Sequence, residues 1–319
     1  MTHECEVNVL KGEAETLFSL GHCYFCQSKY VDATSLVEEC LLIRQKHFPA
    51  NVQVASTMRL LGDCFMRQNK LSDAERLLRH SLEIMKSAHT KDHRDLAHVQ
   101  FTLSQCLSQQ DKLSESIKLM TDCVRMYKSS LHHEHPDVAK AVGQLGEYLL
   151  EVGNLDESEQ YLRECLDIHR HSIQEQHPHT AFPLKCLGKC LLKKGNNKEA
   201  EKLLSEAVAI EAVGLHQNHP DKISTLILWS ECLLNITDYT CAQPALVDAL
   251  RIININQQPS NSRQRSKVMR LLRRLSPFQR PQSGETIIGE RKAVVEQTDE
   301  RGNRLERKSS IEDEVENDR

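Results

Sequence analysis

Residues 145–168 read LGEYLLEVGNLDESEQYLRECLDI, and this stretch contains the pattern that decides the fold. Apolar residues recur at helical spacing on both sides of residues 151–156. Those six residues form a short turn signal in which Gly153 suits the end of a helix. The stretch therefore predicts two antiparallel helices joined by a tight turn.

The same pattern occurs six times along the chain. A small residue recurs every 41 or 42 residues, and we call this the small row: Gly21, Gly62, Ser104, Gly146, Gly188 and Ser230. A large apolar residue stands immediately before each, in what we call the leading row: Leu20, Leu61, Leu103, Leu145, Leu187 and Trp229. A second small row follows twelve residues after the first: Ala33, Ala74, Ser116, Ser158, Ala200 and Ala242. Small residues on both helices let the backbones approach closely, and stacked copies bury the remaining apolar stripes. The sequence therefore predicts an all-α solenoid of six helical hairpins.

These residues resemble the tetratricopeptide repeat. The similarity rests on a Leu-Gly pair, an aromatic or apolar residue and an Ala-Glu pair, as in Leu61-Gly62, Phe65 and Ala74-Glu75. The usual period of that repeat is 34 residues. A period of 42 with a His-Pro-Asp tag, as at residues 135–137 and 219–221, is similar to the kinesin-light-chain type. The resemblance implies a right-handed α-α superhelical solenoid over residues 13–256.

The chain divides into five predicted segments. We expect an N-terminal segment at 1–12, six repeats at 13–256, a linker at 257–262, a capping helix at 263–276 and a disordered charged tail at 277–319. Kinesin light chains carry a long heptad segment before their repeats, and twelve residues leave no room for it, so we expect something other than a complete kinesin light chain. Nephrocystin-3-like proteins place similar repeats behind a nucleotide-binding domain. The chain has no phosphate-binding Gly-rich loop, so we expect no cofactor.

Composition excludes several classes of protein. The 319 residues carry a net charge of −4, which gives no general attraction to nucleic acid. No apolar run approaches the 18 residues of a membrane span, and the N-terminus lacks the apolar core of a signal peptide. Twelve cysteines in a long chain without a signal peptide favour reduced thiols over disulfides. We therefore expect a cytoplasmic protein.

Most cysteines fall on two repeat positions. One row contains Cys23, Cys64, Cys106, Cys190 and Cys232, with Tyr148 in the fourth copy; the other contains Cys40, Cys123 and Cys165. Both rows favour small buried residues, so we expect these eight thiols to act as small core side chains. Cys23 and Cys26 have metal-ligand spacing but lack a partner motif, and the same structural interpretation is favoured for them. Cys5 and Cys241 have no assigned role.

The histidines allow two hypotheses. They gather at residues 132–135, 169–171 and 177–179, which could indicate a metal centre and a metal-dependent enzyme. Alternatively, His93, His135, His177 and His219 recur because each starts a helix, three of them directly before a proline. Successive copies lie too far apart for one metal ion to join them. We favour the second hypothesis and expect no bound metal and no enzyme activity.

By analogy with the family, partners bind on the concave side formed by the first helix of each hairpin. The positions three before and one after the small row should be exposed there, and the first of these rows reads Phe18, Arg59, Phe101, Gly143, Lys185 and Ile227. The predicted partner-binding residues are Phe18, His22, Arg59, Asp63, Phe101, Gln105, Lys185, Lys189 and Lys193, with Phe18 and Phe101 as apolar anchors. The three lysines form a basic stripe, which either grips carboxylates of a partner or pairs locally with Glu147 and Glu151. The Asn row by which family members hold peptides is absent.

The C-terminal part changes character. Residues 249–284 contain eight Lys or Arg and no acidic residue. The repeat register continues through Val268, Leu271 and Leu275, which predicts a helix that covers the last hairpin. Its basic face could instead contact calmodulin or acidic lipid. Ser309 and Ser310 follow two basic residues and are possible phosphorylation sites.

The sequence thus favours a non-catalytic adaptor that presents a curved surface to protein or peptide partners. A cargo adaptor like the kinesin light chains, acting with a motor heavy chain, is the second hypothesis. A metal-dependent enzyme built on the histidine loops is the third.

Overall fold

The computed structural model describes residues 3–47, 51–88, 93–172, 177–256 and 261–275. These ranges contain thirteen α-helices, a single turn of 3-10 helix (η1, Pro178–Thr180) and no strand. The helices are α1 (His3–Cys26), α2 (Tyr30–His47), α3 (Val52–Arg67), α4 (Leu71–Ser87), α5 (His93–Gln109), α6 (Leu113–Ser130), α7 (Pro136–Val152), α8 (Leu155–Ser172), α9 (Ala181–Lys194), α10 (Asn197–Gly214), α11 (Asp221–Asn235), α12 (Tyr239–Asn256) and α13 (Asn261–Leu275). The predicted all-α solenoid is confirmed.

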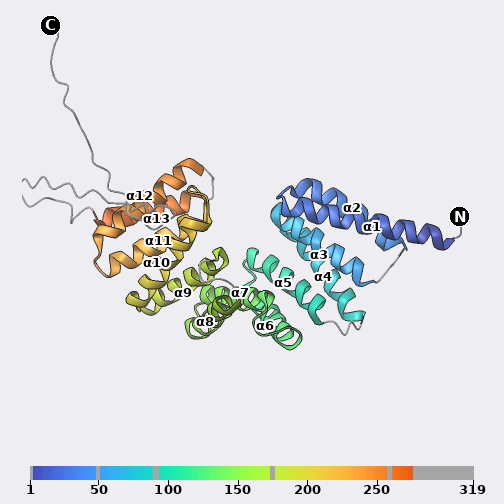
Figure 1. Ribbon diagram of the computed structural model, residues 1–319, viewed down its shortest axis with the longest axis horizontal. Coiled ribbons are helices and arrows are strands. Elements are labelled where there is room, and N and C mark those ends of the chain that lie inside the picture. Colours follow the sequence, from blue (N-terminus) through green and yellow to red (C-terminus); the bar gives the residue numbers. More distant parts are fainter. Residues whose placement is uncertain (1–2, 48–50, 89–92, 173–176, 257–260, 276–319) are drawn as a thin grey trace, which may run out of the picture. The chain divides into compact units, whose positions relative to one another are not determined.

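Successive helices pair in the order of the sequence (Figure 1). The most extensive contacts join α1 with α2, α3 with α4, and so on to α11 with α12. Each second helix also packs on the first helix of the next pair. Helix α7 ends where its sequence predicts, because Gly153 adopts a left-handed φ of 89° at the C-cap.

The small row makes room for a leucine of the paired helix. A methyl group added at Gly62 would lie 2.8 Å from Leu78, and one added at Gly146 would lie 2.7 Å from Leu162. The second small row adds a hydrogen bond where it carries serine, because Ser158 donates to the carbonyl of Gly146 at 2.7 Å. Close approach of the two backbones is therefore what the small residues provide.

One cysteine row joins the two helices of the first, third and fourth hairpins. The thiols donate to a carbonyl that lies 26 residues earlier on the first helix, and a serine does the same in the second copy: Cys40 to Ala14 at 3.1 Å, Ser81 to Ala55 at 2.7 Å, Cys123 to Ala97 at 3.2 Å and Cys165 to Ala139 at 3.2 Å. Burial raises the pKa of Cys165 to about 12. These thiols are protonated core groups, as predicted.

The other cysteine row joins neighbouring hairpins. Its thiols donate to a carbonyl at the start of the preceding second helix: Cys106 to Leu71 at 3.4 Å, Cys190 to Leu155 at 3.3 Å and Cys232 to Asn197 at 3.1 Å. The prediction was wrong for Cys23, which is exposed. In the described ranges no helix packs against α1 in the way that α4 packs against α5, so the same repeat position faces outward.

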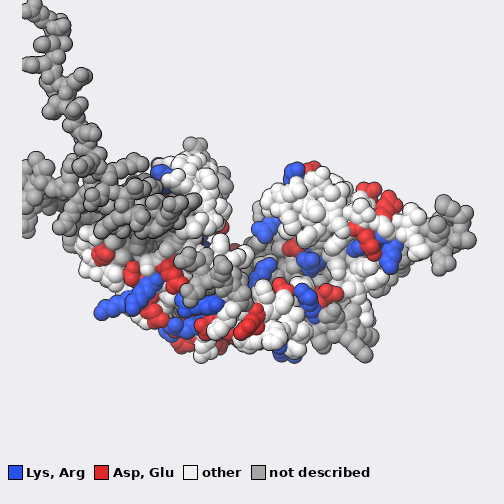
Figure 2. All heavy atoms as spheres, in the orientation of Figure 1, with Lys and Arg blue, Asp and Glu red and all other residues white. Residues whose placement is uncertain are grey.

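Ion pairs connect the second helices. The bridges span 36 residues and run from a basic side chain of one hairpin to a glutamate of the next: Arg79 to Glu115 at 2.8 Å, Lys128 to Glu164 at 2.6 Å, Arg163 to Glu199 at 2.7 Å and Arg170 to Glu206 at 3.5 Å. Figure 2 accordingly shows acidic and basic side chains interspersed on the face in view. Such exposed pairs stabilise each junction by under about 1 kcal/mol.

Helix α13 lies against α11 and α12. Val268, Leu271 and Leu275 are buried in the same apolar cluster as residues of those two helices. Lys267 also forms an ion pair with Glu231 of α11 at 2.7 Å. The contact supports the proposed capping role. None of the helices in the described ranges is both long and apolar enough to cross a membrane.

Candidate functional site

The first helices of neighbouring hairpins contact one another, in the pairs α1–α3, α3–α5, α7–α9, α9–α11 and α11–α13. They therefore form a shared surface, which we call the first-helix surface. This is the side on which the predicted partner-binding residues were placed. Ser309 and Ser310 lie outside the described residues.

The N-terminal part of this surface surrounds one carboxylate with cations. Arg59 forms an ion pair with Asp63 at 2.9 Å, and both side chains are half-buried. Burial raises the pKa of the Asp63 carboxyl, and the positive charges of Arg59, Lys140 and Arg67 oppose that shift. The structure thus brings together two predicted residues and adds Lys140, which was missed.

The two predicted apolar anchors are covered by cations. The guanidinium of Arg44 lies 4.9 Å from the ring centre of Phe18, and the ammonium of Lys140 lies 5.0 Å from that of Phe101. Phe18 is half-buried. Phe101 is only 7% exposed and belongs to the core, so the prediction that it is an exposed anchor is wrong. Lys140 of the next hairpin closes over it through a cation–π contact.

The remaining predicted residues lie along the same surface. His22 is exposed and Gln105 is half-buried. Lys185 and Lys189 are half-buried, whereas Lys193 is exposed and donates to the carbonyl of Leu150 at 3.0 Å. Their expected ion pairs with two glutamates do not form within 4.0 Å among the described side chains. Glu147 instead accepts a hydrogen bond from Gln144 at 2.6 Å, and burial raises the pKa of its carboxyl.

A pocket of about 370 Å³ opens between α7 and α9, with α8 behind it. Its lining residues include Ala139, Lys140, Gln144, Cys165, His169 and Phe182. Gly143 lies beside this pocket and lets two of its wall residues pack closely on α7, because a methyl group there would lie 2.8 Å from the Cys165 sulfur and 3.5 Å from the Phe182 ring. We call it the Gly143 pocket. Gly143 occupies a repeat position where the other copies carry large side chains, which is the signal that could have revealed the pocket from sequence.

One buried polar atom of the Gly143 pocket has no partner. His169 is 8% exposed, and its Nδ1 atom has no hydrogen-bond partner among the described residues. Burial lowers the pKa of His169, and the charges of His179 and His177 lower it further, so the ring is neutral near pH 7. Lys140 is exposed at the edge of the pocket. The pocket therefore combines an apolar wall with one cation, one unpartnered imidazole nitrogen and the carboxylate of Asp137, which forms an ion pair with Arg94 at 3.6 Å.

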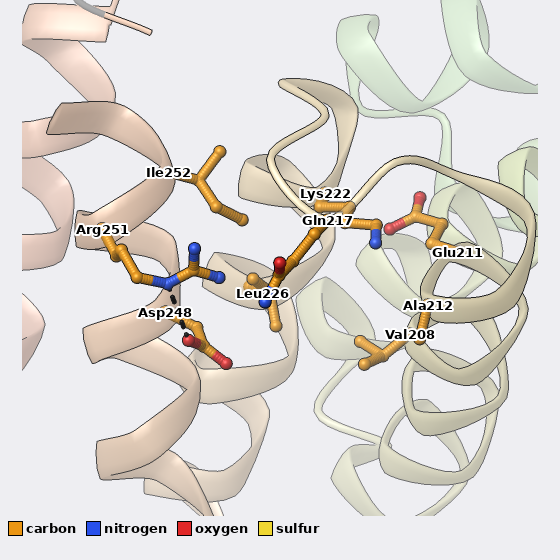
Figure 3. Close-up of a pocket in the computed structure, with 9 residues that line it drawn as sticks. All are labelled: Val208, Glu211, Ala212, Gln217, Lys222, Leu226, Asp248, Arg251 and Ile252. Carbon is orange, nitrogen blue, oxygen red and sulfur yellow. Dashed lines mark hydrogen bonds and ion pairs between the residues drawn. The ribbon is translucent and has the colours of Figure 1, made fainter. Parts of the chain in front are cut away.

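A second pocket of about 380 Å³ lies on the other side of the hairpins, between α10 and α12 (Figure 3). Ala212 stands here at the repeat position of Arg170, so the ion pair between second helices is missing at this junction. The cations of this pocket already have protein partners. Arg251 donates to Asn218 at 2.7 Å, and Lys222 donates to the carbonyl of Leu215 at 3.0 Å. These contacts make it the weaker candidate for a binding site.

The histidines act at helix starts. The Nδ1 atom of His135 accepts the backbone N–H of Asp137 at 3.1 Å, and His219 accepts that of Asp221 at 3.3 Å. His177 accepts the N–H of His179 at 3.3 Å. No group of three metal-ligating side chains occurs among the residues that the structure describes. The role of these histidines in starting helices is confirmed.

Comparison with known proteins identifies the repeats. A family model described as the tetratricopeptide repeat matches residues 12–87, 53–129 and 137–211. No curated protein matches the sequence. The crystal structure of BtubC (BKLC) from P. vanneervenii is 18% identical, with a TM-score of 0.61 over 72% of this chain and 92% of that one. A Podosopora anserina putative kinesin light chain with nearly identical TPR-like repeats is 19% identical, with a TM-score of 0.55 over 65% and 99%. A Rap protein complexed with competence and sporulation factor is 12% identical, with a TM-score of 0.55 over 83% and 74%. These likenesses concern the fold alone.

Proposed function

The chain belongs to the tetratricopeptide repeat family, and from this premise we propose that it is a non-catalytic cytoplasmic adaptor. It holds a segment of a partner protein against the first-helix surface. The observation that carries this proposal is the Gly143 pocket, which lies on that surface and contains the unpartnered Nδ1 atom of His169.

The shape of the pocket selects the partner side chain. A volume of about 370 Å³ accommodates one apolar side chain and part of its backbone. Phe182 supplies an aromatic wall, and Ala139 and Cys165 supply small side chains beside it. The free Nδ1 of His169 can form one hydrogen bond with a polar group of the segment.

The charges select an acidic segment. Arg59, Lys140, Lys185 and Lys189 lie along α3, α7 and α9 on this surface, and the carboxylate of Asp63 is already paired with Arg59. Lys140 stands beside the pocket. The partner segment therefore carries an apolar side chain with Asp or Glu next to it, and its binding weakens as salt is added.

A peptide library displayed on phage and selected against the full chain tests this proposal. We expect enriched peptides to pair an apolar residue with neighbouring acidic residues. Gly143→Leu, which displaces the Cys165 and Phe182 walls of the pocket, and Lys140→Glu, which reverses the charge beside it, should each weaken their binding by about tenfold or more. Val213→Glu is the matched control, because Val213 is 87% exposed on α10 and lies away from the pocket.

The two variants differ in how much they disturb the fold. Gly143→Leu could strain the contact with Cys165, so its thermal unfolding is compared with that of the unchanged protein. Lys140 is exposed, and its substitution leaves the fold intact. Peptides that bind both variants as tightly as the unchanged protein would show that the partner uses another surface.

A kinesin-light-chain-like cargo adaptor is the second candidate. The fold of the Podosopora anserina protein supports it. Co-purification of this chain with a kinesin heavy chain tests it. Contact of residues 263–276 with calmodulin or acidic lipid ranks lower, because Val268, Leu271 and Leu275 are buried in the repeat core and cannot enter another apolar groove.

A further inference from the structure

Among the described residues, no second helix packs on the outer side of α1. Within the described residues, the leucines of the leading row are buried wherever a hairpin precedes them, as Leu61, Leu103 and Leu145 show with at most 3% exposure, and Trp229 is partly buried. Leu20 of the same row is 44% exposed. We call Leu20, Cys23 and Gln27 the α1 edge; all three are exposed.

Two residues of the α1 edge occupy positions that bind the preceding second helix elsewhere. In the third copy, Cys106 and Gln110 both donate to the carbonyl of Leu71, at 3.4 Å and 3.3 Å. In the second copy, Gln68 donates to the carbonyl of Tyr30 at 3.1 Å. Leu71 and Tyr30 are each the first residue of a second helix. Cys23 and Gln27 offer the same pair of donors to solvent.

A lysine beside the α1 edge occupies the repeat position of a charge contact. Lys112 of the third copy binds Glu75 of α4 at 2.7 Å. Lys29 holds the same repeat position in the first copy and lies 5.3 Å from the ring centre of Tyr24. The first copy thus has an apolar side chain, two hydrogen-bond donors and a cation in the arrangement with which the third copy holds a helix.

We propose that the α1 edge is a docking site for an amphipathic α-helix of a partner protein, which occupies the place that a second helix takes at the later junctions. The argument is continuity with the junctions inside the molecule. The partner helix has an apolar stripe for Leu20, a carbonyl in its first turn that accepts further hydrogen bonds from Cys23 and Gln27, as that of Leu71 does, and a carboxylate one turn further on for Lys29. This site is separate from the first-helix surface.

The probe is a peptide with the sequence of α4, residues 71–87, acetylated, labelled with fluorescein and held helical by a lactam bridge on its solvent face, since short isolated helices are marginal in water. Fluorescence anisotropy measures its binding to the full chain. We expect Leu20→Glu to weaken binding by about tenfold or more, because a charge would be buried against the stripe. Val213→Glu should leave binding unchanged. Glu75→Lys in the peptide should weaken binding about threefold through repulsion from Lys29.

Thiol alkylation locates the contact. Saturating peptide should slow the reaction of iodoacetamide with Cys23 by about fivefold or more and leave Cys241, which is also exposed, unchanged. Equal rates at Cys23 with and without peptide would overturn the proposal, as would equal binding to Leu20→Glu. Sedimentation velocity of the chain alone supplies a further test. Dimers that Leu20→Glu dissolves would assign the edge to a second copy, which also overturns the proposal for a partner helix.

Discussion

The leading row is exposed to solvent at the N-terminal end of the repeat array and buried at the C-terminal end. At the N-terminal end Leu20 is 44% exposed, whereas at the C-terminal end Leu271 of α13 is 1% exposed against the last hairpin. Both leucines stand at the same repeat position. The difference shows that the environment of a residue in a solenoid depends on whether a neighbouring hairpin is present, and not on its own sequence pattern.

Removing α13 should have the largest effect, because it exposes the apolar residues at the C-terminal end as they are exposed at the N-terminal end. A chain that ends after Gln258 loses the burial of Val268, Leu271 and Leu275. We expect its unfolding free energy to fall by at least about 3 kcal/mol, or the shortened chain to aggregate. A chain that ends after Pro281 retains α13 and serves as the control. Melting temperatures of the two chains check the prediction, and unchanged hydrogen-exchange protection over residues 240–253 after the longer deletion would contradict it.

Substitution within the leading row compares the ends directly. Leu271→Ala should lower the unfolding free energy by about 2–4 kcal/mol, because it leaves a cavity in a buried cluster. Leu20→Ala should change it by under about 0.5 kcal/mol, since Leu20 already contacts solvent. Chemical denaturation of the two variants measures the difference. Equal losses would show that α1 is also covered in solution.

The cysteine row sharpens the same comparison with a smaller effect. Cys106 is fully buried and Cys23 is exposed. Cys106→Leu should destabilise the protein by about 1–3 kcal/mol through overpacking, and Cys23→Leu should be neutral within about 0.5 kcal/mol. Cys106→Ala removes the thiol without adding volume, so it should lower the unfolding free energy by less than the leucine substitution does. A tolerated leucine at Cys106 would contradict the close packing of that row.

The stability of the protein should depend on pH through His169, which lies between two interior hairpins. The folded protein lowers the pKa of His169 below its ordinary value of 6.5, so the unfolded chain binds a proton more readily. Stability is therefore highest above pH 7 and falls as the pH drops through the ordinary value. Between pH 7.5 and 5.5 the unchanged protein should lose up to about 1 kcal/mol more than His169→Gln. Parallel pH profiles of the two proteins would argue against a buried neutral imidazole.

Sequence reasoning predicted burial correctly for residues that pack within their own hairpin. The spacing of the small row predicted every helix pair, and it placed Cys165 and Cys123 in the core because both face their own hairpin. It failed for Cys23, since row reasoning assumes that a hairpin precedes each copy. It also failed for Phe101, which is covered by Lys140 from the next hairpin. Contacts between copies depend on which side chains the neighbouring hairpin carries, and one row of repeat positions does not contain that information.

The Gly143 pocket could be predicted only in part. Gly143 breaks a row of large side chains, and that break is visible in the sequence. The walls come from α7, α8 and α9 together, so their meeting depends on how two hairpins stack. His169 gave no sequence signal, because one buried histidine among many does not reveal which nitrogen lacks a partner.

Leu272 governs how long the array can become. It stands at the repeat position of Gly62, Gly146 and Gly188, where each glycine admits a leucine of a following helix. A leucine at that position would collide with such a helix, so a helix could not pack on α13 as α4 packs on α3. An engineer who wished to append a seventh hairpin would first replace Leu272 with glycine or serine.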